Sequence, residues 1–194
     1  MGRGRPREFD EKQALEAAME VFWRKGYEGA SCEDLLSAMG LNSGSMYAAF
    51  GDKQALYDRA FDLYCDTVFC KGLEILDGPG TPLENVRALV QCMGDHMSSG
   101  ECNGCFVGNT LIEFGDQNKG VAEMARRTMK RMQDAVEKKL KAARRSGELS
   151  GDGRPTDLAA FVMNTAQGLN VMSKAGADEK TIRGIVSTTL SLLC

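Results

Sequence analysis

The sequence predicts an all-α protein, and three observations support that fold class. Between turn signals, apolar residues recur at intervals of three and four, the period of one helix face, rather than at every second position. Short stretches rich in Val, Ile and Thr, which are typical of strands, are missing. Hydrophobic residues make up 43% of the 194 residues, so the chain can bury a sizeable core.

We expect about nine helices, bounded by glycine-rich turns such as GYEGAS, FGD and DGPGTP. A small N-terminal module of three helices comes first, and a fourth helix connects it to a larger helical body. We expect two domains, residues 1–51 and 52–194. The predicted helices cover, in order, about 9–25, 32–39, 43–50, 52–76, 82–98, 104–114, 119–146, 156–173 and 179–193.

Composition limits where the protein works and what it binds. No apolar run approaches ~18 residues, and the first residues, MGRGRPREF, lack the apolar segment of a signal peptide. We therefore expect a cytoplasmic protein whose seven cysteines are mostly reduced, with no cofactor. The net charge of −3 excludes a globally basic nucleic-acid binder but permits a locally basic surface.

Three capping signals mark a pair of short helices in the N-terminal module. Ser31 followed by Asp34 fits a capping box, and Gly40 is a plausible left-handed end for the helix that Ser31 begins. Asn42 is a good N-cap for the next helix. Two short helices joined by a glycine-containing turn predict a helix-turn-helix, whose second helix enters the DNA major groove with its N-terminus first.

The first turn of that second helix carries small polar residues, Ser43, Gly44 and Ser45, followed by Tyr47. Small side chains let the backbone approach base edges closely, and serine can hydrogen-bond to any base. A helix N-terminus also favours phosphate.

Residues 9–57 resemble the DNA-binding domain of the tetracycline-repressor (TetR) family. The resemblance implies base-edge contacts by Ser43, Gly44 and Ser45, and phosphate contacts by Tyr47 and Lys53. Ser31 and Asn42 complete the expected DNA-binding set. The matching residues are Ala17, Ala18, Met19, Phe22, Gly26, Tyr27, Ser31, Leu35, Leu36, Met39, Gly40, Leu41, Gly44, Ser45, Met46, Tyr47, Phe50, Lys53, Leu56 and Tyr57.

One position departs from the family pattern, because Ala49 stands where the family often has His or Tyr. An N-terminal arm carrying Arg3, Arg5 and Arg7 offers replacement phosphate contacts in a minor groove. The alternative is a disordered tail of no consequence. Residues 1–60 hold eight basic and ten acidic residues, so DNA binding must depend on a few placed groups and on dimer symmetry.

The last two helices, about 156–193, are expected to form a homodimer interface, as the resemblance implies. They offer more apolar surface than one side of each helix needs, although they could instead pack only on their own body. A two-fold axis would present two recognition helices to a pseudo-palindromic operator. The apolar residues concerned are Leu158, Phe161, Val162, Leu169, Ile182, Ile185, Val186 and Leu190.

The middle helices are expected to enclose a pocket for a small effector, with apolar walls and a few polar groups. Plain core is the alternative for each lining residue. The candidates are Phe61, Tyr64, Cys65, Phe69, Met93, Met97, Cys105, Phe106, Asn109, Glu113 and Met132.

Cys102 and Cys105 form a Cys-x-x-Cys beside a predicted helix start, where a thiol becomes more nucleophilic. They are candidates for an oxidant or electrophile sensor. Together with Cys92 and His96 they could instead form a metal-ligand set. A further alternative is that these cysteines are ordinary buried thiols without a sensing role.

The sequence therefore predicts a ligand- or redox-responsive DNA-binding regulator, and specifically a repressor released from DNA by an effector. A thiol enzyme that uses Cys105 with His96 as its base is one alternative. An all-α scaffold without DNA binding is another. Residues 119–145 carry ten basic and three acidic residues, which we interpret as the solvated face of a long amphipathic helix.

Overall fold

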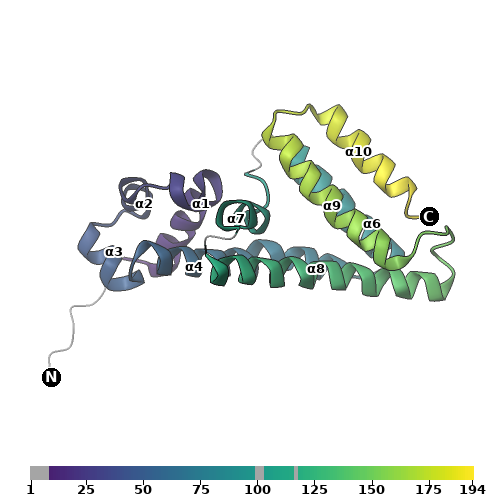
Figure 1. Ribbon diagram of the computed structural model, residues 1–194, viewed down its shortest axis with the longest axis horizontal. Helices are drawn as coiled ribbons and strands as arrows, with labels where there is room; N and C mark the ends of the chain where they lie inside the picture. The colour runs from purple at the N-terminus through teal and green to yellow at the C-terminus, as the bar shows by residue number, and fades with distance from the viewer. Residues whose placement is uncertain (1–8, 99–102, 116–117) are drawn as a thin grey trace, which may run out of the picture. The chain divides into compact units, whose positions relative to one another are not determined.

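The computed structural model describes residues 9–98, 103–115 and 118–194, and every regular element among them is a helix, which confirms the all-α prediction. The chain divides into two compact units between Asp66 and Thr67. None of the described helices is both long and apolar enough to cross a membrane. Figure 1 labels the α-helices of both units except α5, Cys70–Leu76.

From residue 9 onward the first unit contains four α-helices, and the first of them, α1, packs against α2 and α4. An aromatic cluster forms the centre of its core: the Phe22 and Tyr57 rings meet edge to face at 5.0 Å, as do those of Trp23 and Tyr64. Leu35, on α2, is also fully buried. The bounds are α1 Glu11–Gly29, α2 Cys32–Met39, α3 Ser43–Phe50 and α4 Lys53–Tyr64.

Local caps set where these helices begin and end. The capping box predicted at Ser31 and Asp34 is present, and Gly40 adopts the left-handed conformation with φ 63°. Asn42 caps α3 as predicted, and Asp52 caps α4 through a 2.8 Å bond from the Ala55 amide. Short-range hydrogen bonds thus define the helix-turn-helix.

In the described part of the second unit, helices α5, α6, α7 and α9 contact the long helix α8. Helices α6, α8 and α9 all contact one another, and α10 contacts α6 and α9. Figure 1 shows α9 and α10 side by side. The core shared by α6, α8 and α9 includes Val86, Leu89, Val136, Leu140 and Val162. The bounds are α5 Cys70–Leu76, α6 Pro82–Ser98, α7 Phe106–Phe114, α8 Lys119–Ser146, α9 Pro155–Lys174 and α10 Glu179–Ser191.

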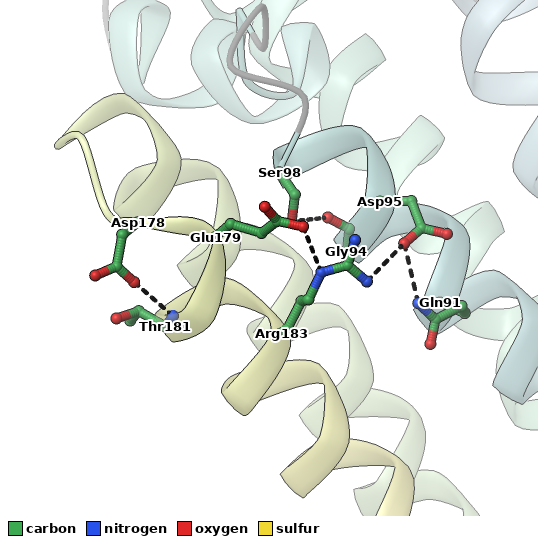
Figure 2. A network of polar contacts seen from close by, with 8 residues as sticks. All are labelled: Gln91, Gly94, Asp95, Ser98, Asp178, Glu179, Thr181 and Arg183. Atoms are coloured by element: carbon green, nitrogen blue, oxygen red, sulfur yellow. Dashed lines mark hydrogen bonds and ion pairs between the residues drawn. The ribbon is translucent and has the colours of Figure 1, made fainter.

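Helices α6 and α10 approach closely because Gly94 has no side chain. A Cβ atom at this position would lie 2.4 Å from Cγ2 of Val186. Beside this contact, Arg183 of α10 donates to Glu179 at 2.7 Å and lies 3.8 Å from Asp95 of α6, as Figure 2 shows. Arg87 donates to the carbonyl oxygens of Leu190 and Leu193, the end of α10.

The helix expected over 52–76 is divided in the structure. Helix α4 ends at Tyr64, a π-helical turn η1 covers Cys65–Phe69, and α5 follows. The boundary between the two units falls within η1, whereas the sequence suggested residues 51 and 52. Helix α4 groups with the first unit because it packs against α1.

Candidate nucleic-acid interface

The N-terminal turn of α3 presents an exposed polar surface. The Asn42 side chain accepts a 2.8 Å hydrogen bond from the Ser45 amide, which fixes the start of the helix. Ser43 and Gly44 are exposed in the first turn, while Met46 and Phe50 face the core. Of the predicted contact residues on α3, Ser43 and Gly44 are therefore exposed to solvent, and Ser45 is half-buried.

Tyr47 extends this surface by one turn and is 48% exposed. Its phenol hydrogen-bonds with the thiol of Cys32 on α2, and this bond raises the pKa of Tyr47 above its usual value. A phenol with a pKa at or above its usual value of about 10 is protonated at neutral pH, so the Tyr47 hydroxyl can donate to an anion such as phosphate.

Lys53 lies at the first position of α4, where its ammonium stands 4.5 Å from the centre of the Tyr27 ring. The Tyr27 ring in turn meets the Tyr57 ring edge to face at 5.3 Å, so the ring that Lys53 contacts is packed against the aromatic cluster. Burial raises the pKa of Tyr27, with nearby carboxylates adding to the effect. This cation–π contact restrains the cation beside a helix N-terminus.

Ser31 acts first as a cap. Its hydroxyl accepts from the Asp34 amide at 3.1 Å and donates to the Asp34 carboxylate at 2.8 Å. Lys25 reaches the other oxygen of that carboxylate at 2.7 Å. The hydrogen bond from Lys25, followed by those from Ser31, lowers the pKa of Asp34 to about 2.

Arg59 supports the recognition helix, and sequence analysis missed it. It donates to Glu11 of α1 at 2.7 Å and to the Ala49 carbonyl at 3.2 Å, and its guanidinium stands 4.7 Å from the Phe50 ring centre. Arg59 thus ties the end of α3 to the start of α1. No local pattern reveals a pair separated by 48 positions.

The other predicted sites are spread through the chain. Arg3, Arg5, Arg7 and Cys102 lie outside the described residues. Among the pocket candidates, Phe61 and Tyr64 are buried in the core of the first unit, and Cys65 lies in η1. Met93 and Met97 belong to α6 of the second unit, and Phe69 and Met132 pack in its core. Phe106, Asn109 and Glu113 belong to α7 of the same unit.

Cys105 is the N-cap of α7, at the helix start that the sequence predicted. Its sulfur accepts a hydrogen bond from the Gly108 amide at 3.4 Å. Close by, the Lys174 ammonium donates to Asn109 at 3.1 Å, and Asn109 donates to the Asn103 carbonyl at 3.2 Å. These bonds tie the residues on both sides of Cys105.

Cys92 and His96 are exposed on α6. Across the described ranges, no three His, Cys, Asp or Glu side chains are grouped closely enough to hold a metal ion. Cys92, His96 and Cys105 are therefore not brought together as a ligand set.

Family profiles match both units of the chain. The profile of "Bacterial regulatory proteins, tetR family" matches residues 14–60. The profile of "Tetracyclin repressor-like, C-terminal domain" matches residues 82–188. The first match covers the helix-turn-helix, and the second covers most of the second unit.

Full-length relatives agree with these matches. The HTH-type transcriptional regulator YezE of Bacillus subtilis strain 168 is 31% identical over 192 residues, covering 98% of this chain and 99% of the relative. The HTH-type transcriptional repressor ComR of Escherichia coli K12 is 28% identical over 195 residues, covering 98% and 91%.

A solved structure shows the same fold. It is a cysteine-substituted variant of the TetR family transcriptional regulator CifR in complex with a 26-bp operator duplex. It superposes with a TM-score of 0.87 at 29% identity, covering 97% of this chain and 98% of that one.

Proposed function

This chain belongs to the tetracycline-repressor family of DNA-binding transcriptional regulators, and we propose that it represses transcription as a homodimer that leaves its operator when an effector acts. Family membership makes it a regulator and not an enzyme, so the alternative of a Cys105–His96 thiol enzyme is set aside. The alternative of a scaffold without DNA binding is set aside on the same ground.

The exposed first turn of α3 is the observation that carries the proposal. Ser43 and Gly44 present no bulk that would keep the helix N-terminus from base edges, and Ser45 follows on the same turn. Tyr47 and Lys53 supply a neutral donor and a cation at the flanks of this surface, where phosphates would lie. We assign base contacts to the serines and phosphate contacts to Tyr47 and Lys53.

The dimer is proposed from the exposed apolar side of α9. Half of the apolar residues that suggested an interface, among them Val162 and Ile182, are buried within their own unit. Three large apolar side chains nevertheless remain accessible on α9: Phe161 at 39%, Val171 at 60% and Met172 at 38%. A Cβ at Gly168, between them, would meet open space, so another helix can approach there.

Release from DNA requires an effector that binds the two states of the dimer with different affinity. We propose that it acts on the second unit. Cys105 is a second candidate trigger, because a thiol at a helix N-terminus is a good nucleophile and its sulfur already holds the Gly108 amide. Oxidation or alkylation would change the size of the sulfur group that caps α7 and the geometry of its hydrogen bond with the Gly108 amide.

Selection of bound sequences from a random duplex pool, with and without the thiol oxidant diamide, tests the proposal. We expect enrichment of a pseudo-palindrome. Loss of enrichment on oxidation in the wild type but not in Cys105→Ser would assign the trigger to Cys105. A palindrome that is indifferent to diamide would leave the repressor and favour a non-covalent effector. Absence of any enrichment at low salt would contradict operator binding.

Single variants then separate the proposed contacts on the selected operator. Ser43→Ala should weaken binding by about 1–3 kcal/mol and relax sequence preference, whereas Lys53→Gln should weaken all sequences alike and lower the salt slope by about 1. Ser37→Ala is the matched control, because Ser37 is an exposed serine on α2, away from the first turn of α3. Equal effects of Ser43→Ala and Ser37→Ala would contradict the assignment.

A further inference from the structure

Helix α8 carries a charge opposite in sign to that of the chain around it. Residues 119–145 hold ten basic and three acidic residues, although the whole chain has a net charge of −3. The remainder of the chain is therefore acidic, and the first 60 residues alone hold ten acids against eight bases. Positive charge is concentrated on one helix of the second unit.

These cations lie on one exposed side of the helix. The opposite side of α8, with Val121, Met132, Val136 and Leu140, is buried in the core of its unit. We call the exposed cations the α8 basic face. They are Lys119, Arg126, Arg127, Lys130, Arg131, Lys138, Lys141 and Arg145.

Part of this face is paired and part is free. Arg126 and Arg127 lie 3.9 Å from Glu123, and Lys141 lies 2.6 Å from Glu137. Lys130 pairs with Asp134. Such exposed pairs within one helix are weak and screened, so they leave much of the positive field in place.

Arg131, Lys138 and Arg145 form no ion pair or hydrogen bond with any residue that the structure describes. They are seven positions apart, so they lie in one row along the helix, about 10.5 Å from each to the next. Beside Arg131 the surface is hollowed into an open depression of about 670 Å³, lined by four cations and by Glu123 and Asp134.

A long row of free cations matches a long, regularly charged anion. Duplex DNA carries one negative charge per roughly 1.7 Å of its axis, and the row from Arg131 to Arg145 extends about 21 Å along α8, so it runs beside several successive phosphates. A membrane surface fits less well, because an interfacial helix buries its apolar face in lipid and that of α8 is already in the core.

We propose that the α8 basic face binds the phosphate backbone of duplex DNA without regard to sequence, as a DNA-contacting surface separate from the helix-turn-helix. It adds non-specific electrostatic attraction to that of the first unit, where acidic residues outnumber basic ones over the first 60 residues. The proposal goes beyond operator recognition and does not depend on which sequence α3 reads.

The test compares two double variants of the full chain that remove the same charge. Arg131→Gln with Lys138→Gln neutralises the row, while Lys71→Gln with Lys180→Gln neutralises two exposed lysines on α5 and α10. Binding to a fluorescent duplex of scrambled sequence is measured by anisotropy from low to moderate salt. The first variant should lower the slope of log K against log salt by about 2, and the second should leave it near the wild-type value.

Further variants keep the result interpretable. Arg131→Lys with Lys138→Arg retains both charges and should bind as the wild type does. A background of Ser43→Ala with Tyr47→Phe should retain the slope difference, because both substitutions lie on α3 and leave every charge of the α8 basic face in place. Far-ultraviolet circular dichroism checks that each variant is folded.

Equal slopes for the two neutralised variants would overturn the proposal. So would loss of scrambled-duplex binding in the Ser43–Tyr47 background alone. Polyglutamate and anionic lipid vesicles serve as competing probes: if neutralising the row weakens binding to either of them and leaves duplex binding unchanged, the face serves another partner and the proposal is wrong.

Discussion

The first unit holds its candidate site with contacts between near neighbours in the sequence, whereas the second unit forms its surfaces by packing distant segments. Ser31 bonds to Asp34, and Asn42 bonds to Ser45, each across three positions. In the second unit, Gly94 accommodates Val186, and Arg87 closes the end of α10 from 103 positions away. Local caps can be predicted from a motif, but such packing partners cannot.

The contrast has one instructive exception. The recognition helix is capped locally at its start, but Arg59 holds its end through the Ala49 carbonyl and through Glu11. The first unit therefore combines a local start with a long-range end. Perturbing each unit separately should show how independent the two kinds of contact are.

The largest expected effect comes from Phe22→Ala, which removes a fully buried ring from the aromatic cluster of the first unit. We expect a loss of about 3–5 kcal/mol in the unfolding free energy of that unit. Trp23 is the only tryptophan and lies in the first unit, so its fluorescence reports that unit during urea unfolding. Circular dichroism reports mainly the longer helices of the second unit. An equal shift in both signals would show that the units unfold together.

Gly94→Ala makes the complementary perturbation in the second unit. Its Cβ would collide with Val186, so we expect about 1–3 kcal/mol of destabilisation, seen by circular dichroism during urea unfolding. Gly184→Ala on α10 is the matched control, because a Cβ there meets nothing within 4 Å. That control should be neutral or stabilising by up to about 1 kcal/mol. Equal costs at the two glycines would contradict the close α6–α10 contact.

Ser31→Ala removes the cap of α2 and should cost about 1 kcal/mol in the first unit, measured by Trp23 fluorescence during urea unfolding. Ser37→Ala on the same helix should cost much less, because Ser37 is exposed and is not at the cap. A stability loss that is the same for both serines would mean that the capping box contributes little.

The smallest effect is the pH dependence of that cap. The pKa of Asp34 is about 2 in the folded protein, below its ordinary value near 4, so the unfolded chain takes up the proton first. The stabilisation is present above about pH 4 and is lost as the pH falls toward 2. Urea unfolding between pH 5 and pH 2.5 should show a weaker acid dependence for Asp34→Asn than for Glu33→Gln. Identical acid dependence would contradict the role of Lys25 and Ser31.

The helix-turn-helix could be predicted in detail from the sequence because its signals are short-range. The Ser31–Asp34 box, Gly40 and Asn42 each define a helix end within a few residues, and the structure places all of them as expected. The grouping of pocket candidates could not be predicted this way. Phe61 and Tyr64 have the same apolar character as Met97, yet they belong to the core of a different unit.

By itself, the sequence determined the all-α class, the positions of the caps and the polar first turn of the recognition helix. These depend on helix periodicity and on hydrogen bonds between residues a few positions apart. Only the tertiary structure decided that Arg59 holds the end of α3 and that Phe161, Val171 and Met172 stay exposed while Val162 is buried. Burial and ion pairing depend on which distant helix packs against a given face, and helical periodicity alone does not specify that partner.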